Sequence, residues 1–533
     1  MKTKLFFLLF ISFVSNANAQ LIVNGGSVII QSNAAISVQG SVTTNADITG
    51  AGKIILVGNS TSINTNGFSI ANLDINTTGS ISLSGNTRVL NNISFTAGKI
   101  LVNNFNLNVA PLTSITGFGS SKFIETNGTG QLRKEVTAAG NYTLPLGVGS
   151  LYMPLDYVVS GGSYASGAYL SGMLLNATHP NKPLRAEDYL NQYWRSNYNG
   201  ITGATINATT NYLEVGGLTG LEVGLNGLVW DGSNWGNALN TINTATNAIT
   251  YPNVINNTDL YAMNKFVLAK AKVFLQGAYN SSTGLMSDNL RNAPSLIPLS
   301  DPYRVAPYST NFAHFNNATI ETIASSVLNT QANSNDNIVD WVFLELRNTT
   351  NQLIQTRSAL LQRDGDIVDT DGINAVCFKD INPANYILTV RHRNHLGMGA
   401  EQTTYSKSLG LNNPALSNSF DFSSATDAEV FGPSTAFTIA SHPTLTSVNL
   451  LWGGNANSNS TVRFSGLQND KDFILVTTLS NSPSLLLNNV YHQADINMNR
   501  NVRYAGLQND KDFLLVTVLN SEASVVRTQA IPN

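Results

Sequence analysis

A short motif, a glycine followed by a run of aliphatic residues, recurs at residues 26–30 (GSVII), 52–56 (GKIIL), 79–83 (GSISL) and 98–102 (GKILV). The starts of these motifs are 26, 27 and 19 residues apart. A glycine turn followed by a strand, repeated at about this period, predicts the stacked coils of a parallel β-solenoid. Asn and Ser are expected in its turns, where they can form ladders. An ordinary β-sandwich with glycine-containing turns is the alternative.

The composition is poor in charge. Of the 533 residues, 11% are Asp, Glu, Lys or Arg, 42% are apolar, and the formal net charge is −3. An average soluble domain has about 25% charged residues, so Asn, Ser, Thr and Gly take their place here. This balance excludes a coiled coil, a charge-rich disordered tail and a basic nucleic-acid-binding protein. The length of the chain predicts several domains.

Residues 1–19 have the pattern of a secretory signal peptide. Lys2 and Lys4 precede an apolar run at residues 5–14, and the Ala-Asn-Ala sequence at 17–19 resembles a cleavage site. The apolar run is too short to span a bilayer, and no later run is long enough to do so. The sequence therefore predicts a secreted protein, or one on the outer cell surface, without a membrane-spanning segment.

The remaining chain predicts an all-β, multidomain architecture. After a solenoid-like region at residues 20–112, short alternating runs separated by Gly and Asn predict β-sandwiches at 113–270 and 271–408. The Asn- and Ser-rich passage at 409–448 predicts a linker. Cys377 lies in an apolar run, which predicts a buried structural thiol rather than a nucleophile.

A duplication fills the C-terminal region at residues 449–533. The segment 462–473 (VRFSGLQNDKDF) recurs as 502–513 (VRYAGLQNDKDF), at an offset of 40 residues and with ten of the twelve positions identical. The sequence therefore predicts a small module built from two equivalent halves.

Alternating oxygen-bearing side chains precede the second copy of this repeat. Asp495, Asn497 and Asn499, followed by the carbonyl of Asn501, have the spacing of the first half of a calcium loop. A hard cation needs such oxygen donors from one curled segment, and Asp510 closes the site if the chain folds back. The predicted calcium site is expected to be weak, with a dissociation constant of ~0.1–1 mM.

The first copy has the same spacing but no carboxylate, since residues 455–461 read NANSNST. Asp470 corresponds there to Asp510. Both loops lack the glycine that calcium loops have at position 6, where Ser460 and Arg500 stand. The alternative is that the Asn side chains only cap turns through bonds to the backbone.

Two aromatic residues are a candidate ligand-binding site. Trp230 and Trp235 flank residues 231–234 (DGSN), a turn sequence that would place both rings at a hairpin end. Exposed rings in this position would stack on sugars. Two core aromatic residues beside a turn are the alternative.

Other polar clusters predict structural roles. Asp364 and Asp366 flank Gly365, a pattern of a hairpin turn or, alternatively, of a cation site. His392 and His395 are three residues apart on a predicted strand, which puts them on opposite faces in a solvated basic patch. No metalloprotease, serine-hydrolase, phosphate-loop or dinucleotide motif is present. The sequence thus predicts a protein that is not an enzyme; a deep cleft lined by converging acidic side chains would contradict this.

Three stretches resemble secreted or surface multidomain proteins of Bacteroidota-type bacteria, often described as haemagglutinin-like. They are residues 123–133 (FIETNGTGQLR) with 144–147 (LPLG), the run from 360 to 390, and the duplicated loops. The run at 360–390 looks like a transthyretin-like or immunoglobulin-like sandwich unit, and the duplicated loops look like a dockerin-like module. The resemblance implies calcium ligands at Asp495, Asn497 and Asn499, with Asn501 acting through its carbonyl.

These features together predict a non-catalytic, adhesin-like extracellular protein that binds a polysaccharide or a cell surface. Two alternatives stay open: a carbohydrate-binding accessory protein of a polysaccharide-degrading system, and a structural surface protein that self-associates. A nucleic acid is not an expected partner.

Overall fold

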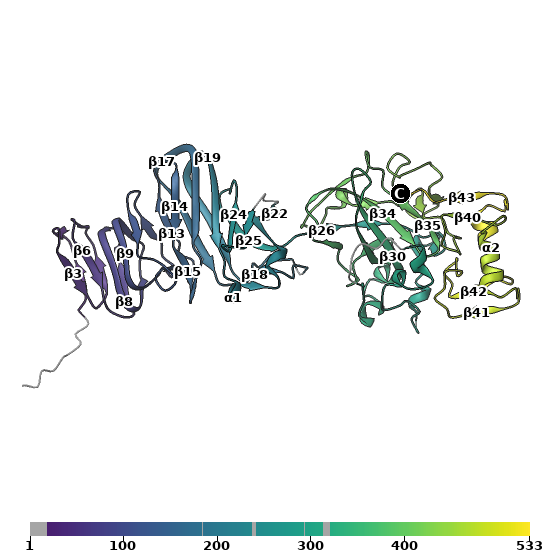
Figure 1. Ribbon diagram of the computed structural model, residues 1–533, viewed down its shortest axis with the longest axis horizontal. Coiled ribbons are helices and arrows are strands. Elements are labelled where there is room, and N and C mark those ends of the chain that lie inside the picture. Colours follow the sequence, from purple (N-terminus) through teal and green to yellow (C-terminus); the bar gives the residue numbers. More distant parts are fainter. Residues whose placement is uncertain (1–18, 184, 237–240, 293, 313–319, 533) are drawn as a thin grey trace, which may run out of the picture. The chain divides into compact units, whose positions relative to one another are not determined.

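The computed structural model describes residues 19–183, 185–236, 241–292, 294–312 and 320–532. Strands make up 45% of the chain and helices 9%, which confirms the all-β prediction. The chain folds as two compact units, Met1–Asn264 and Lys265–Asn533, as Figure 1 shows. The expected signal peptide, apart from Ala19, lies outside the described residues.

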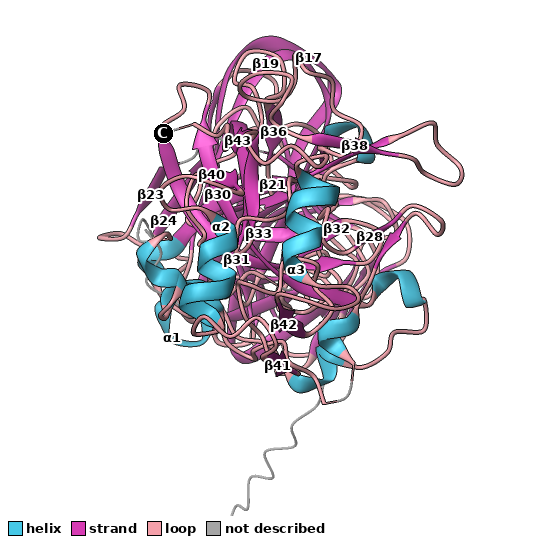
Figure 2. Ribbon diagram, turned by 90° about the vertical axis from the view of Figure 1, so that its right-hand side faces the viewer, coloured by secondary structure: helices cyan, strands magenta, loops and turns pink. Residues whose placement is uncertain are grey.

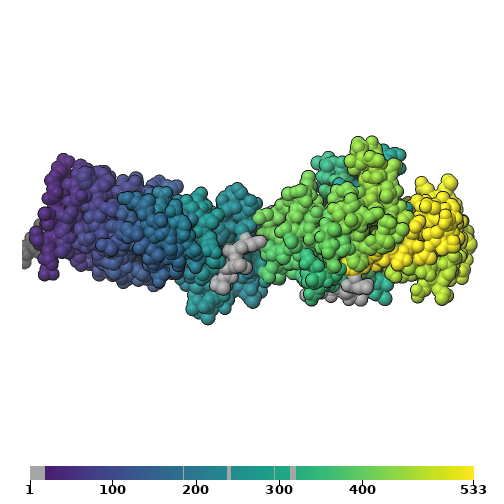
Figure 3. All heavy atoms as spheres, turned by 90° about the horizontal axis from the view of Figure 1, so that it is seen from above, coloured from purple at the N-terminus to yellow at the C-terminus, as the bar shows by residue number. Residues whose placement is uncertain are grey.

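A parallel β-solenoid forms the first part of the first unit, as the glycine motifs predict. Its short strands stack in three columns, one of which runs β1–β4–β7 and a second β2–β5–β8, while β3, β6 and β8 begin the third. Figure 3 shows the coils as successive bands of colour along this unit. The strands are β1 (Leu21–Val23), β2 (Val28–Ile29), β3 (Ala35–Val38), β4 (Val42–Thr44), β5 (Ile48–Thr49), β6 (Lys53–Leu56), β7 (Thr61–Asn64), β8 (Ser69–Leu83), β9 (Thr87–Leu101), β10 (Leu107–Val109), β11 (Ser114–Thr116), β12 (Ile124–Glu125) and β13 (Leu132–Glu135).

The coils are shorter than the spacing of the first glycine motifs indicates. Paired residues of successive coils are 18 apart at Ala35 and Lys53 and 25 apart at Leu107 and Leu132. Only the motifs at 79–83 and 98–102 stack on each other, because the motifs at 26–30 and 52–56 lie in different columns.

Aliphatic side chains fill the solenoid and polar ladders line its turns. Ile54, Ile63 and Ile81 are fully buried. Asn45 donates through Nδ2 to Asn24 Oδ1 at 3.3 Å, and Asn66 donates to Asn45 Oδ1 at 2.6 Å. These bonds confirm the predicted Asn ladder.

A curled, mainly antiparallel sheet continues the solenoid over the rest of the first unit. Strand β13 pairs with β10 in parallel and with the long strand β17 in antiparallel, so the region predicted as a sandwich shares one continuous sheet with the coils. Its elements are β14 (Gly140–Leu144), β15 (Leu146–Val148), β16 (Leu151–Tyr152), β17 (Leu155–Leu175), β18 (Tyr189–Leu190), β19 (Tyr193–Asn211), α1 (Glu214–Gly217), β20 (Leu218–Thr219), β21 (Leu225–Trp230), β22 (Trp235–Gly236), β23 (Thr241–Asn243), β24 (Ala248–Tyr251) and β25 (Thr258–Asn264).

The second unit is built on an eight-stranded sheet of order β35-β34-β30-β31-β32-β27-β37, with β36 paired to β34. A two-stranded sheet, β26–β33, shares its core. The strands are β26 (Phe266–Ala269), β27 (Ala271–Lys272), β28 (Tyr279–Asn280), β29 (Leu285–Met286), β30 (Ile338–Asn348), β31 (Leu353–Gln362), β32 (Asp366–Val368), β33 (Val376–Lys379), β34 (Ala384–His392), β35 (His395–Gly399), β36 (Lys407–Leu409), β37 (Phe420–Asp421), β38 (Thr438–Ala440) and β39 (Val448–Leu450).

Residues 409–448, for which the composition predicts a linker, pack into this core instead. Phe420 and Phe422 are fully buried, and β37 adds to the edge of the main sheet beside β27. Apolar residues at alternate positions within an Asn- and Ser-rich passage are the signal that distinguishes a short edge strand from a linker. Cys377 is buried in β33, as its apolar surroundings predict.

The duplicated segment forms a closed module with its own small core. Each half contains a strand and a helical segment, and β40 of the first half pairs with β43, while β41 pairs with β42 of the second half. Figure 2 shows α2 and α3 on the face that is turned toward the viewer. The elements are β40 (Thr461–Arg463), α2 (Asp470–Asp472), continued by a π-helical turn at Phe473–Thr478, β41 (Leu486–Asn488), β42 (Asn501–Arg503), α3 (Asp510–Asp512), continued at Phe513–Val518, and β43 (Val526–Thr528).

Candidate functional site

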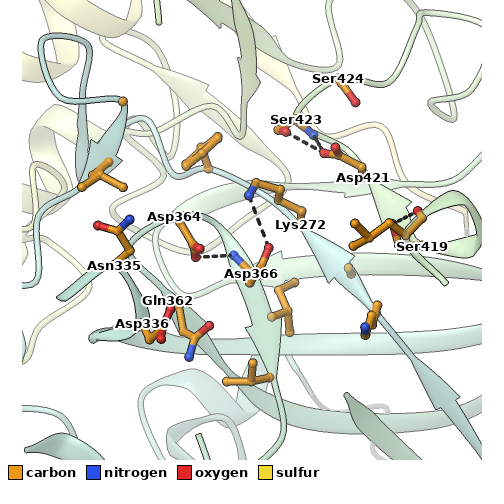
Figure 4. A pocket seen from close by; sticks show the side chains of 18 of the residues that line it. Lys272, Asn335, Asp336, Gln362, Asp364, Asp366, Ser419, Asp421, Ser423 and Ser424 are labelled. Atoms are coloured by element: carbon orange, nitrogen blue, oxygen red, sulfur yellow. Dashed lines mark hydrogen bonds and ion pairs between the residues drawn. The ribbon is translucent and has the colours of Figure 1, made fainter. Parts of the chain in front are cut away.

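A groove of about 880 Å³ opens on the second unit, at the edge of the main sheet. Strand β27 lies between β32 and β37, and the register places Lys272 opposite Asp366 on one side and opposite Asp421 on the other. Lys272 Nζ lies 3.3 Å from Asp366 Oδ1, and this contact is drawn in Figure 4. Lys272, paired with Asp366 and opposite Asp421 in the strand register, therefore lines the groove together with these two carboxylates.

The hairpin turn between β31 and β32 supplies the wall. Gly365 has φ +93°, a conformation that only glycine adopts without strain, so the sequence prediction of a turn is confirmed. Asp364 Oδ1 accepts the backbone N–H of Asp366 at 3.2 Å. Burial, together with the negative charges of Asp366 and Asp336, raises the pKa of Asp364. Figure 4 shows Asp364 and Asp366 next to each other in the groove.

The acidic groups of the groove keep acceptor capacity for a ligand. Asp421 Oδ1 accepts the backbone N–H of Ser423 at 3.0 Å and its hydroxyl at 2.6 Å. Among the described residues, neither Asp364 nor Asp421 has a basic side chain within 4 Å. Their oxygens can accept hydrogen bonds from paired hydroxyl or ammonium groups.

Apolar side chains border the same groove. Leu416 is 83% exposed, Ile373 is 76% exposed, and Leu445 is 56% exposed. The groove therefore combines hydrogen-bond acceptors with exposed apolar side chains.

No single segment of the sequence could have indicated this site. Residues 272, 366 and 421 come from three strands and meet only through strand pairing. The Asp-Gly-Asp sequence at residues 364–366 was the one local pattern that pointed to this region. It was interpreted as a turn, and the sequence did not show that the same turn lines a groove.

The structure places Trp230 and Trp235 on a hairpin, as predicted, but does not expose both rings. Trp235 is 4% exposed and donates through Nε1 to the carbonyl of Asn181 at 3.0 Å. The ring centroids of Trp235 and His179 are 4.7 Å apart, and those of Trp230 and Trp235 are 5.2 Å apart. Trp235 therefore belongs to an aromatic core, and a sugar platform made of two exposed tryptophans is not present.

The second Asn/Asp loop folds back onto its helix, which is the geometry that a closed cation site needs. Asp510 accepts the backbone N–H of Ile496 at 3.0 Å and that of Arg503 at 2.9 Å. Asp495 accepts those of Asn499 and Arg500, both at 2.9 Å. Both carboxylates are fully buried, and they are brought together from the two ends of the loop.

Burial of the two carboxylates of this loop is electrostatically unfavourable for their charged forms. Burial raises the pKa of Asp495 to about 7, and burial followed by the charge of Asp495 raises the pKa of Asp510 well above its usual value. Asn497 and Asn499 donate through Nδ2 to the carbonyl of Gln508, at 2.9 Å and 3.0 Å. Their amide oxygens already accept backbone N–H groups, so these side chains also cap turns.

By type, the donors of the second loop fit a hard cation, since they are two carboxylates, amide oxygens and a carbonyl. Both oxygens of each carboxylate, however, already accept backbone N–H groups. The buried Oδ1 of Asn501 has no partner within the described part of the chain. Arg500 has φ +76°, so an arginine adopts the conformation for which calcium loops usually have glycine. Clusters of three or more His, Cys, Asp or Glu suited to a metal are absent from the described residues.

The first loop repeats the fold-back with fewer charges. Asp470 accepts the backbone N–H of Asn457 at 3.3 Å and that of Arg463 at 2.9 Å. Asn455 replaces the first carboxylate, and its buried Oδ1 has no partner among the described residues.

The prediction that His392 and His395 lie on opposite faces of one strand, in a solvated patch, is wrong. His392 ends β34 and His395 begins β35, so a tight hairpin brings their Nδ1 atoms to 3.1 Å. Both are buried, as is Arg393 in the turn between them. The Arg-Asn pair at 393–394 was a turn that strand alternation alone could not reveal.

Comparison with known proteins finds no match: no family model, no curated protein and no solved structure is similar to the chain. Among the described residues, none of the helices has the length and hydrophobicity that crossing a membrane requires.

Proposed function

We propose that this chain is a non-catalytic, adhesin-like extracellular protein that binds a polysaccharide through the groove of its second unit. The observation that supports this is the row Asp366–Lys272–Asp421, flanked by Asp364 and bordered by exposed Leu416 and Ile373. Carboxylates bind pairs of sugar hydroxyls, and aliphatic side chains cover the C–H face of the ring. Secretion or display on the outer surface, as the N-terminal sequence predicts, would bring the groove to its ligand.

One observation favours a second candidate, hydrolysis of the bound polysaccharide. A glycosidase needs a carboxylic acid with a raised pKa near a second, ionised carboxylate. Burial raises the pKa of Asp364, and Asp366 lies beside it. Against this, Asp366 is paired with Lys272. Non-catalytic binding is therefore the first choice, and the experiment includes the second.

A glycan array with the purified chain tests the groove. Asp364→Asn and Asp421→Asn keep the shape of the side chain and remove the charge, and we expect each to weaken retention of the bound glycan about tenfold or more, since hydrogen bonds to charged groups contribute ~1.5–3 kcal/mol. Asp427→Asn is the matched control, because Asp427 is exposed and does not line the groove. Unchanged retention by both groove variants would reject this site.

The alternative of a carbohydrate-binding accessory protein uses the same groove. The tryptophan hairpin gives it little support, because Trp235 is buried. If the glycan binds in the groove and not at the tryptophan hairpin, Trp230→Ala should leave glycan retention unchanged. This substitution removes a half-buried ring.

We also propose that the second loop of the terminal module binds calcium through Asp495, Asn497, Asn499, Asn501 and Asp510. When bound, the cation would balance the two buried carboxylates. The residues themselves hold the loop in its folded-back form through the backbone bonds of Asp495 and Asp510. The relationship to haemagglutinin-like proteins with a dockerin-like module is likewise a proposal, which rests on the sequence resemblance alone.

Self-association is a further role that a separate surface of the first unit favours, namely the uncharged first coil of the solenoid.

A further inference from the structure

The first coil of the solenoid leaves three strand edges open. In the described part of the chain, β1 pairs only with β4, β2 only with β5, and β3 only with β6. Every later coil has a neighbour on both sides in at least part of its length. This first coil is the purple end of the first unit in Figure 1.

The hydrogen-bond pattern identifies the backbone groups that face outward. Leu21 N–H donates to Ser41 at 3.0 Å, and the carbonyl of Val23 accepts Asn45 N–H at 2.8 Å. Alternate residues of a strand bond to opposite sides, so the N–H and C=O of Ile22 point away from β4. In β2, Val28 and Ile30 bond toward the second coil, and Ile29 faces outward in the same way.

Residues 20–46, which form the first coil and the start of the second, have none of the side chains that usually protect such an edge. Residues 20–46 include no Asp, Glu, Lys, Arg or Pro. Natural sheets usually guard an open edge with charges, proline or a covering segment, because unpaired strands associate. The side chains of Ile22 and Ile29 are also 64% and 63% exposed.

A side-chain ladder is left open at the same place. Asn66 donates to Asn45, and Asn45 donates to Asn24. Asn24 is exposed, and its side chain is the last of this ladder among the described residues. Both the backbone strands and the Asn ladder of the solenoid therefore end at the first coil.

We propose that the first coil is the interface of a dimer with a second copy of this chain. The first coil of a second copy has the same three strands. A twofold axis perpendicular to the solenoid axis places the first coil of one copy on the first coil of the other. The paired strands then run antiparallel: one column pairs with its own copy, and the other two columns pair with each other. This contact closes on itself, because each copy uses its one open edge.

The absence of charge favours this partner over a charged one. Residues 20–46 have no charged side chain, so strand pairing between two first coils brings no like-charged side chains together. The strands β1, β2 and β3 are short, so the interface is small and a dissociation constant of ~1 μM or weaker is expected. The surface is separate from the groove, so the dimer and the proposed glycan binding can fail independently.

Sedimentation equilibrium of the chain starting at Gln20 tests the dimer. Ile22→Pro with Ile29→Pro removes two outward N–H groups without touching a ladder bond, because edge strands accept proline at such positions. We expect a concentration-dependent dimer for the unmodified chain and a dissociation constant raised tenfold or more by the proline pair. Circular dichroism checks that the β-sheet signal is retained.

A matched lysine pair keeps the test decisive if proline disturbs the coil. Ile22→Lys together with Ile29→Lys charges two of the three columns, so like charges meet across the interface whichever column pairs with its own copy, and the dimer is expected to weaken. Val57→Lys adds the same kind of charge at an exposed side position of the second coil and is expected to leave the dimer intact. A chain that stays monomeric at all concentrations, a dimer unaffected by the lysine pair at 22 and 29, or open-ended growth into filaments would each overturn the proposal.

Discussion

At the scale of single residues, Asp340 connects the main sheet with the terminal module. It is fully buried and accepts a hydrogen bond from Arg393 Nε at 2.9 Å and from the Tyr491 hydroxyl at 2.7 Å, while His392 Nε2 lies 3.1 Å away. Burial alone would raise the pKa of Asp340, but Arg393 and His392 outweigh it and hold the pKa at about 2. The carboxylate is therefore ionised and fully paired.

Replacing Asp340 with Asn should destabilise the second unit by about 3–5 kcal/mol, because the change leaves Arg393 buried without its counter-charge. Tyr491→Phe removes one hydrogen bond to the same carboxylate and should cost less, about 1.5–3 kcal/mol. Urea unfolding of the full chain measures both. Equal losses of unfolding free energy for the two variants would show that the charge pair between Asp340 and Arg393 does not contribute more than the single hydrogen bond from Tyr491.

The stability contributed by Asp340 should also depend on pH. Its folded pKa, about 2, lies below the unfolded value of about 3.9. The unfolded state therefore binds the proton more readily, so this contribution is complete above about pH 4 and is lost as the pH falls toward 2. The difference in unfolding free energy between the unmodified chain and Asp340→Asn should shrink over this range; a constant difference would contradict the assignment.

The two tryptophans should differ in the same kind of experiment. Trp235 is packed against His179 and Tyr261 and should cost about 3–5 kcal/mol when replaced by Ala. Trp230 is half-buried and should cost less. A larger loss for Trp230→Ala than for Trp235→Ala, measured by denaturant unfolding, would contradict the described burial.

At the scale of elements, the two Asn/Asp loops share one backbone path but differ in charge. The second loop has Asp495 where the first has Asn455, and both have the closing Asp, 510 or 470. The sequence predicted the ligand spacing, because alternation is local. The sequence predicted Asp510 as a ligand only on the condition that the chain folds back. This fold-back depends on non-local bonds such as that from Ile496 N–H to Asp510.

Calcium should therefore stabilise the terminal module mainly through the second loop. At ~1 mM calcium we expect a rise in the melting temperature of the chain that Asp510→Asn abolishes, since weak extracellular sites have dissociation constants of 0.1–1 mM. Asn455→Asp adds the missing carboxylate to the first loop and should increase the rise. Asp472→Asn is the control, because its carboxylate accepts a hydrogen bond from Asn469, the residue that caps the helix start, and is not one of the loop ligands.

A calcium effect that survives Asp510→Asn would place the cation elsewhere. No effect of calcium on the unmodified chain, in melting or in isothermal titration, would mean that the Asn side chains act only as turn caps, as their bonds to the backbone of residues 499 and 501 allow.

At the scale of the whole molecule, the sequence predicted the fold class but not the placement of distant segments. The coils of the solenoid could be predicted because glycine and aliphatic residues recur in local patterns. The contact of β37 with β27, by contrast, joins residues about 150 positions apart, and no local pattern encodes such a pairing. For this reason residues 409–448 were expected as a linker, and the groove they help to form was not foreseen.

The two units have separate cores and should unfold separately. Trp235→Ala should lower only the transition of the first unit in differential scanning calorimetry of the full chain, and Asp340→Asn only that of the second. A single transition that both variants shift equally would show that the units are energetically coupled.

The size distribution of a polysaccharide retained by the protein tests the central claim most directly. A glycan identified on the array is incubated with the chain for many hours, and its length is measured by size-exclusion chromatography before and after. We predict retention that depends on Asp364 and Asp421, with the length of the polysaccharide unchanged. Shortened chains that disappear with Asp364→Asn would show that the groove cleaves its ligand, and would contradict a purely binding role.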